Sequence, residues 1–452
     1  MSGVILTHMA AKKTKFKVIF SLFAVFSLGS CTTMSDYDFS RIDANFGRGD
    51  YSSVSAELEK HKSRIYSSRG ELLYLLDNGI LHHFGGDTAR SNEALSEAEK
   101  LIEKYAAMSV MQSAVSLAAN DTVMDYPGED FEDIYTNIFM SLNYLKENNR
   151  EDAMVEIRRF DNKLKLMQSK YEQQVAVANG NGSGVTVEKV SAQFSNSAFA
   201  RYLSMLLYRA DGDMPNAELD LRFLREAFQS QSGIYDFAVP SFLDEELSVP
   251  RGMARLNVVG FYGKAPVKVE NVTRVYVPEL SVWYKLSLPQ MARRASAVTL
   301  VSVSARNLET GTVHTRRLEK MESIENIAVD TFARRLSLVK AKSVARAVAR
   351  AASNAFFDVG AAATEGDEPA LSAIFTIIGL AAKIHTEAAE RADTRSARYF
   401  PGSVAVSGMT LEPGDYEVTT QFFGANAALK TVKERVTLKS GALNLVESEC
   451  FL

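Results

Sequence analysis

Residues 199–228 read FARYLSMLLYRADGDMPNAELDLRFLREAF and contain two apolar stripes separated by an Asp211-Gly212-Asp213 turn. Before the turn, apolar residues recur at the spacing of an α-helix, namely Phe199, Tyr202, Leu203, Leu206 and Leu207. After the turn, positions i, i+4, i+7 and i+11 form one helix face, and they are Ala217, Leu221, Leu224 and Phe228. The leading alanine is small enough to let two helices approach closely. The stretch therefore predicts a pair of antiparallel helices.

Two further helix pairs are predicted upstream by the same pattern. In the first, a Gly85-Gly86-Asp87 turn follows the stripe Leu72, Leu76 and Ile80 and precedes the stripe Ala94, Ala98, Leu101 and Tyr105. In the second, an Asn148-Asn149 turn follows Ile134, Ile138, Leu142 and Leu145 and precedes Ala153, Ile157, Phe160 and Leu164. A partial copy begins at Gly49-Asp50-Tyr51.

These helix–turn–helix units resemble tetratricopeptide repeats. Their leading alanines, Ala94, Ala153 and Ala217, lie 59 and 64 residues apart, whereas that family repeats every ~34 residues. We therefore expect a divergent helical array over residues 31–245. Such arrays present an extended concave surface that binds protein partners. The alternative is a helical domain whose grooves bind nothing.

After Pro250 the apolar spacing changes to a period of two, which is typical of β-strands. Leu411-Glu412-Pro413-Gly414 reads as a turn between two strands. We expect an antiparallel β-sandwich-like domain over residues 250–452, so the predicted fold class is α+β. A helical hairpin insertion is predicted at about 325–392. Membrane insertion is the alternative for this hairpin, but its apolar stretch of about thirteen residues is shorter than the ~20 that a spanning helix needs.

Residues 1–30 read as an export signal rather than as part of the fold. Four lysines between positions 12 and 17 precede an apolar run of eleven residues at 18–28. The run ends in Leu28-Gly29-Ser30-Cys31, a lipobox, so we expect cleavage before Cys31 and lipid on its thiol. The alternatives are an ordinary secretory signal with a chance cysteine, or a short core helix. Thr32 stands where an inner-membrane retention signal has aspartate, which favours the periplasmic side of the outer membrane.

The composition narrows the classes of partner. Of 452 residues, 46% are apolar and 23% charged, which is ordinary for a folded globular protein of two or three domains. Without the leader, the chain has 47 basic and 55 acidic residues. Nucleic-acid binding usually needs a basic footprint, so we expect no nucleic-acid partner. Lipid on Cys31 would leave Cys450 as the remaining thiol and exclude an internal disulfide.

Several segments resemble a family of uncharacterised, tetratricopeptide-like bacterial lipoproteins. They include GEDFE at 128–132, LNYL at 142–145, SVARAVARAA at 343–352, ADTRS at 392–396 followed by Pro401, and LEPGDY at 411–416. The sequence departs from the family at Ala397, where an aromatic residue is expected. The resemblance implies the architecture and an envelope location, and it implies no particular reaction.

Two charged clusters are candidate sites. Asp393, Thr394, Arg395 and Ser396 carry the family motif, and we expect a buried ion pair or a network that holds a turn, with a binding point as the alternative. Glu129, Asp130, Glu132 and Asp133 could form a cation site, but their spacing lacks the alternation of a calcium loop. We expect these acids to lie at a helix N-terminus, where they interact favourably with the helix dipole.

No catalytic motif supports an enzyme. The chain lacks His-Glu-x-x-His, Gly-x-Ser-x-Gly and Walker motifs. His82 and His83 are adjacent, so they point about 100° apart on a helix, and we expect surface or capping roles for them. We predict no catalytic residue, metal or cofactor. The favoured function is a non-enzymatic, lipid-anchored scaffold that binds an envelope protein. The alternatives are a cell-wall glycan-binding module that uses Trp283 and Tyr284, and an envelope hydrolase.

Overall fold

The structure is a computed structural model that describes residues 37–111, 124–180, 187, 189–277, 282–341, 343 and 391–452. In these residues helices come first and strands second, with one helix after β4. The α+β fold class is therefore confirmed. Cys31, the leader and the second helix of the predicted insertion lie outside the described residues.

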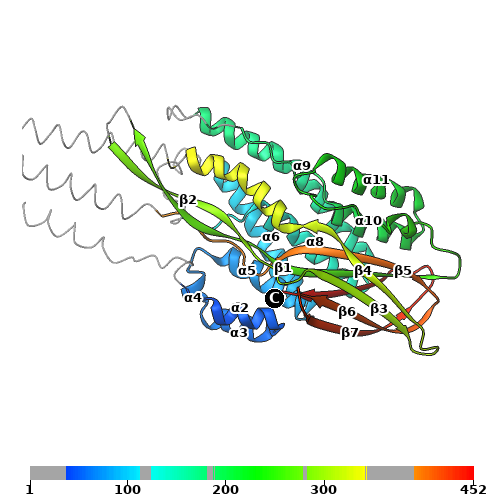
Figure 1. Ribbon diagram of the computed structural model, residues 1–452. Helices are drawn as coiled ribbons and strands as arrows, with labels where there is room; N and C mark the ends of the chain where they lie inside the picture. The colour runs from blue at the N-terminus through cyan, green and yellow to red at the C-terminus, as the bar shows by residue number, and fades with distance from the viewer. Residues whose placement is uncertain are drawn as a thin grey trace, which may run out of the picture.

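In the residues that the structure describes, the helical half has a short N-terminal group and three long pairs (Figure 1). The short group is α2 (Ser40–Arg48), α3 (Tyr51–Lys60) and α4 (Lys62–Ile65). The pairs are α5 (Glu71–Phe84) with α6 (Thr88–Met111), α8 (Asp130–Lys146) with α9 (Arg150–Gly180), and α10 (Ala198–Asp211) with α11 (Met214–Ser230). The three predicted helix pairs are confirmed, as is the partial copy at Gly49.

The turn of the third pair shows how local sequence sets these boundaries. Gly212 ends α10 with a φ of 77°, a left-handed conformation that glycine adopts without a steric penalty. Asp213 then begins α11, because its side chain accepts a hydrogen bond from the backbone N–H of Asn216 at 3.3 Å.

The predicted buried faces are confirmed for two of the second helices, α9 and α11, whose predicted stripe residues are all at most 7% exposed. In α6 the prediction is wrong by about one position, because Leu95 and Ile102 are buried in place of Ala94 and Leu101. The reason lies on the facing helix. A Cβ on Gly79 of α5 would stand only 2.5 Å from Leu95, so this glycine, rather than Ala94, allows the close approach.

After the 3₁₀ helix η3 (Leu243–Glu246), the strands form one curled sheet in the order β2-β1-β5-β4-β3-β6-β7, with β8 beside β1. Neighbours are antiparallel except β1 and β8. The curl brings Lys430 of β7 within 2.6 Å of Glu449 of β8. The strands are β1 (Ala254–Val277), β2 (Val282–Arg294), β3 (Leu300–Asn307), β4 (Val313–Ser323), β5 (Pro401–Leu411), β6 (Gly414–Phe423), β7 (Ala428–Leu438) and β8 (Asn444–Cys450).

The predicted Pro-Gly turn joins two strands that do not pair with each other. Strand β5 lies between β1 and β4, whereas β6 lies between β3 and β7. The turn at 412–413 therefore carries the chain from one part of the sheet to another. Antiparallel pairing is confirmed, but the pairing partners differ from those of a simple hairpin.

The predicted helical insertion is described in part. Residues 324–341 form a helix directly after β4, and residues 391–400 return to β5 without regular structure. The rest of the predicted hairpin, at 344–390, is among the residues that the structure does not describe. No helix in the described part of the chain is both long and apolar enough to cross a membrane.

The sheet packs against the first helix of each pair, and the second helices form an outer layer (Figure 1). At the centre of the contact, the ring of Phe261 on β1 lies 5.8 Å from Phe84, 5.6 Å from Phe139 and 5.9 Å from Phe199. These rings come from α5, α8 and α10. The inner face of the helical half is thus filled by the chain's own strands, and one hydrophobic core extends across both halves.

We expect Phe261→Ala to lower the free energy of unfolding by about 3–5 kcal/mol, because it removes a fully buried ring that contacts three helices. Urea denaturation followed by circular dichroism measures this change. The matched control is Val313→Ala, whose side chain is 55% exposed, and it should change stability by less than about 0.5 kcal/mol. A loss below about 1 kcal/mol for Phe261→Ala would contradict this account of the core.

Candidate functional site

The Asp393–Ser396 motif lies in the irregular segment between the insertion and β5. The Asp393 carboxylate accepts hydrogen bonds from the Arg395 guanidinium at 2.8 and 2.9 Å. Arg395 also donates to the carbonyl oxygen of Met124 at 3.0 Å. Burial raises the pKa of Asp393, but the charges of Lys268 and Arg395 outweigh burial and hold this pKa at about 2. The ion pair orients Arg395, and the hydrogen bonds of Arg395 to backbone carbonyl oxygens then fasten the segment to the helical half.

Ser396, the last residue of the motif, attaches the segment to β1, and a neighbouring ion pair joins β1 to α8. The backbone N–H of Lys268 on β1 donates to Ser396 Oγ at 3.2 Å. The Lys268 ammonium forms an ion pair of 2.6 Å with Glu129, and both side chains are only 2% exposed. Thr394 is half-buried beside these contacts.

Ala397, where the family resemblance implies an aromatic ring, is fully buried. Its N–H donates to Glu132 Oε1 at 2.7 Å. The other oxygen of Glu132 accepts from the Tyr126 hydroxyl at 2.8 Å and from the Glu129 N–H at 2.9 Å. Burial, together with the charge of Glu129, raises the pKa of Glu132 to about 7. This carboxyl accepts hydrogen bonds from three donors of the chain itself.

The acids at 129–133 occupy a helix N-terminus, as predicted. Glu129 is the N-cap of α8 and forms a capping box with Glu132, while Asp130 and Asp133 lie in the first turn. No group of three or more His, Cys, Asp or Glu side chains suited to a metal ion occurs among the residues that the structure describes.

The histidine prediction is wrong for His83, which is neither a surface nor a capping residue. Its side chain is fully buried, with Nδ1 2.7 Å from Asn143 Oδ1 and Nε2 2.8 Å from Glu447 Oε1. Burial raises the pKa of Glu447, but His83 and then Lys146 outweigh it and lower this pKa to about 2. His83 thereby connects α5 and α8 to β8.

Cys450 is buried, and burial raises the pKa of its thiol, which disfavours the reactive thiolate.

The glycan hypothesis rests on residues at the far end of the β1–β2 arm. Trp283 pairs with Tyr276, and Tyr284 pairs with Val275. Their side chains lie outside what the structure describes.

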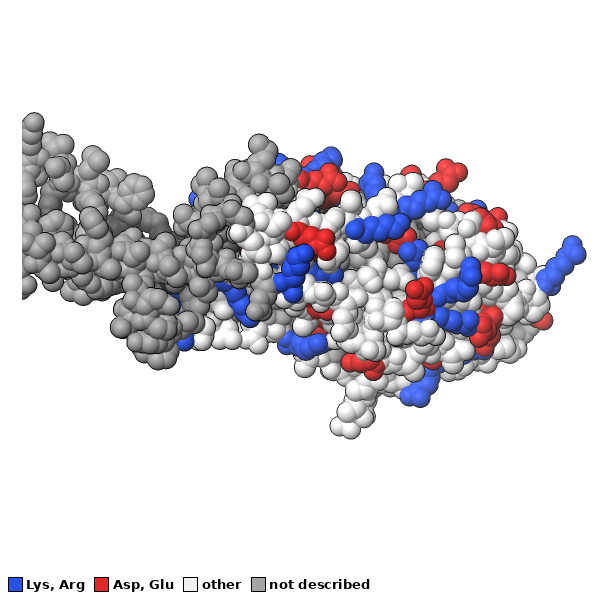
Figure 2. All heavy atoms as spheres, turned by 90° about the horizontal axis from the view of Figure 1, so that it is seen from above, with Lys and Arg blue, Asp and Glu red and all other residues white. Residues whose placement is uncertain are grey.

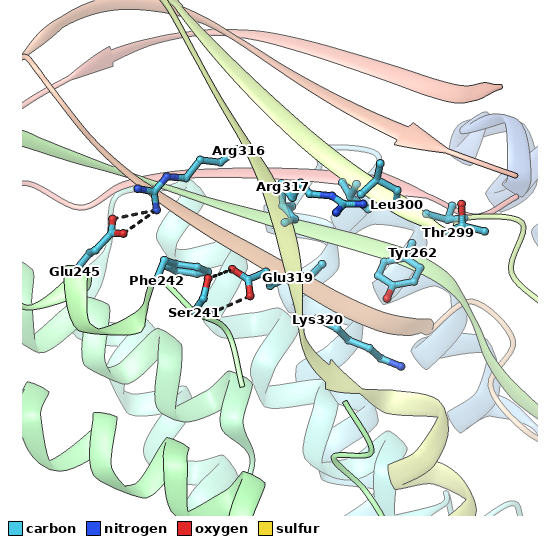
Figure 3. A pocket seen from close by; sticks show the side chains of 14 residues that line it. Ser241, Phe242, Glu245, Tyr262, Thr299, Leu300, Arg316, Arg317, Glu319 and Lys320 are labelled. Carbon is cyan, nitrogen blue, oxygen red and sulfur yellow. Dashed lines mark hydrogen bonds and ion pairs between the residues drawn. The ribbon is translucent and has the colours of Figure 1, made fainter. Parts of the chain in front are cut away.

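A pocket that the sequence analysis did not identify lies where β4 changes partners. Strand β4 pairs with β3 up to Leu318 and with β5 from Glu319 onward, with a register shift between Lys320 and Glu322. This corner leaves a cavity of about 750 Å³ between β1, β3, β4, β5 and the segment at η3 (Figure 3). We call it the corner pocket. Its lining residues are Ser241, Phe242, Glu245, Tyr262, Val298, Thr299, Leu300, Val301, Arg316, Arg317, Leu318, Glu319, Lys320 and Ala405.

The two acids of the corner pocket are already hydrogen-bonded. Glu319 accepts from the N–H and the hydroxyl of Ser241 at 2.9 and 2.7 Å. Glu245 accepts from Arg316 at 3.0 Å and from Arg255 at 3.0 Å. Figure 3 shows these contacts on one side of β4, with Arg317, Lys320 and Tyr262 on the other. The basic residues within 314–320 are the one feature of the sequence that could have pointed to this pocket. The same pattern is typical of an ordinary exposed strand, so it does not identify a pocket.

Because Asp393 has a lowered pKa, its ion pair stabilises the fold above about pH 4 and loses this effect as the pH falls toward 2. We expect Asp393→Asn to destabilise the chain at pH 7 by about 2 kcal/mol. We also expect it to make the loss of stability between pH 4 and 2 correspondingly shallower.

Urea denaturation at a series of pH values measures both effects. Glu309→Gln, at an exposed position, is the control that should leave the profile unchanged. An unchanged profile for Asp393→Asn would contradict the assigned role of the ion pair.

Comparison with protein-family models, curated proteins and solved structures found no match to this chain.

Proposed function

We propose that this chain is a lipid-anchored envelope protein that acts as a non-enzymatic scaffold on the periplasmic side of the outer membrane. The observation that carries the proposal is the lipobox at 28–31 followed almost directly by folded chain. Tyr37 already packs against Phe39 at 5.0 Å, with Arg64 of α4 5.4 Å from its ring. The six Cα–Cα steps from Cys31 to Tyr37 span at most ~21 Å, so a lipid on Cys31 would hold the body close to the bilayer.

The proposed partner surface is the outer face of α9. Because the sheet fills the inner face of the helical half, a partner protein must bind elsewhere. Val155 and Leu166 of α9 are 42% and 65% exposed. They are eleven residues apart and so share one helix face. Seen from above, acidic and basic side chains are interspersed over the visible face, so this face shows no patch of one sign for a charged polymer (Figure 2).

The proposal also includes the architecture of the two halves. We infer that residues 31–245 are a divergent tetratricopeptide-like array and that residues 250–452 are a sandwich-like domain. The repeated helix pairs and the curled antiparallel sheet support this assignment.

Replacing Cys31 by serine tests the anchor. We expect Cys31→Ser to abolish incorporation of labelled palmitate and to leave the 30-residue leader uncleaved, because both steps need the thiol at the lipobox. Metabolic labelling and intact-mass measurement detect these changes. Cys450→Ser, which alters a buried thiol, should be labelled and processed normally. Labelling and cleavage that persist in Cys31→Ser would overturn the proposal.

A photoreactive amino acid at position 166 tests the partner surface in cells. We expect one envelope protein to dominate the crosslinked products, because Leu166 is an apolar side chain, 65% exposed, on the proposed contact face. The same amino acid at position 313, which is also exposed but lies on β4, is the control and should not capture it. Equal capture at both positions, or binding to purified peptidoglycan without a protein partner, would contradict the scaffold proposal.

A further inference from the structure

We propose that residues 391–400, which we call the strap, form a proton-sensitive latch: two buried carboxyl groups, Glu132 and Asp77, keep it closed at low pH and release it as the pH rises. The strap carries the chain from the insertion back to β5. Opening it would free this end of the insertion from α5 and α8 while β5 stays paired in the sheet. The inference goes beyond the scaffold proposal and does not depend on lipid anchoring.

Glu132 of α8 holds the strap at Ala397. Its Oε1 atom accepts a hydrogen bond from the Ala397 N–H at 2.7 Å, and its Oε2 atom accepts one from the Tyr126 hydroxyl at 2.8 Å. The charged groups around this contact come from α8, β1, the helix after β4 and the strap, and they are Glu129, Lys268, Arg335, Asp393 and Arg395. Each of the three cations already pairs with one of the other two acids. Burial and the charge of Glu129 therefore raise the pKa of Glu132 to about 7.

Asp77 of α5 holds the next strap residue, Arg398, in the same way. Its Oδ1 atom accepts from the Arg398 N–H at 2.7 Å, and its Oδ2 atom accepts from the Tyr66 hydroxyl at 2.8 Å. The charged and titratable groups around it come from α2, β1, β2 and the strap, and they are Asp43, Lys264, Arg294, Arg398 and Tyr399. The Arg398 guanidinium already pairs with Asp43 at 2.8 Å, so its charge offsets burial only in part. Burial raises the pKa of Asp77 to about 6.

The two tyrosines allow both acids to take up a proton without releasing the strap. A tyrosine hydroxyl can either donate or accept a hydrogen bond. It donates to the ionised carboxylate, and it can accept from the O–H of the protonated acid while the other carboxyl oxygen still accepts the strap N–H. Both acids and both tyrosines are buried, so water does not solvate an ionised carboxylate here. The closed strap therefore favours the neutral acids.

The direction of the pH effect follows from these positions. Opening the strap lets water reach both acids, whose ordinary pKa values are 4.5 for Glu132 and 3.8 for Asp77. The closed state binds both protons more tightly, so protonation stabilises closure, fully below about pH 4, and this effect is lost as the pH rises through 6 and 7. Between about pH 5 and 8, each acid should raise the ratio of open to closed strap about tenfold or more. The Asp393 pKa of about 2 lies below this range.

Hydrogen–deuterium exchange of the full chain measures strap opening across this pH range. Mass spectrometry follows the peptides that cover residues 392–400, and the exchange is corrected for the intrinsic chemical rate at each pH. The opening ratio should rise about a hundredfold or more from about pH 5 to 8, because two acids contribute. A ratio that stays constant over this range in the unaltered chain would overturn the proposal, and this measurement needs no variant.

Substitutions test whether the two acids cause the rise. Asp77→Asn has the shape of the neutral acid, because its amide oxygen can accept the Arg398 N–H and its NH₂ group can donate to Tyr66. We expect it to reduce the rise about tenfold, and Asp77→Asn with Glu132→Gln to make opening nearly independent of pH. Asp220→Asn is the matched control, since it alters a buried acid of raised pKa on α11, and it should keep the full rise. An undiminished rise in the folded double variant, or an equal loss in Asp220→Asn, would also overturn the proposal.

Discussion

The packing of β1 between two cores is the constraint on which the rest of the structure depends. Successive residues of a strand point to opposite faces of the sheet. In β1, Val259 and Phe261 point to the helices, whereas Leu256 and Val258 point into the curl of the sheet. All four are fully buried. A strand buried on both faces needs helices on one side and curled strands on the other, so neither half can bury its apolar residues without β1.

Buried charged side chains on β1 fix the register of this strand. Arg255 forms an ion pair with Glu246 at 2.9 Å, and Lys268 forms one with Glu129 at 2.6 Å. Such pairs add little net stability, because desolvation offsets their attraction, but breaking one costs about 3–5 kcal/mol. A shift of β1 by one residue would turn every side chain to the opposite face and break both pairs. The apolar contacts thus supply the driving force, and the ion pairs select the register.

The helix pairs could be predicted from the sequence because a period of 3.6 is set by residues close together in the chain. The stripe from Ala153 to Leu164 is an example, and it is buried as predicted. The error in α6 arose because Gly79, on another helix, decided which side packs. Strand partners, the burial of His83 and the corner pocket depend on contacts across long sequence separations. His83, for instance, meets Glu447, which lies 364 residues away. Periodicity carries no information about such partners.

The filled inner face changes what a helical array can do in this molecule. An array normally offers its concave face to a partner, but here Phe261 and its neighbours occupy that face. Binding is left to the outer helices and to openings in the sheet. The corner pocket is not isolated from the helices, because Glu245 at its rim contacts Arg255 at 3.0 Å, and Arg255 pairs with Glu246. Glu246 in turn is bonded to Arg209 of α10. The rim of the pocket is therefore joined to α10 by a continuous series of ion pairs, so the sheet corner and the helical half hold each other in place.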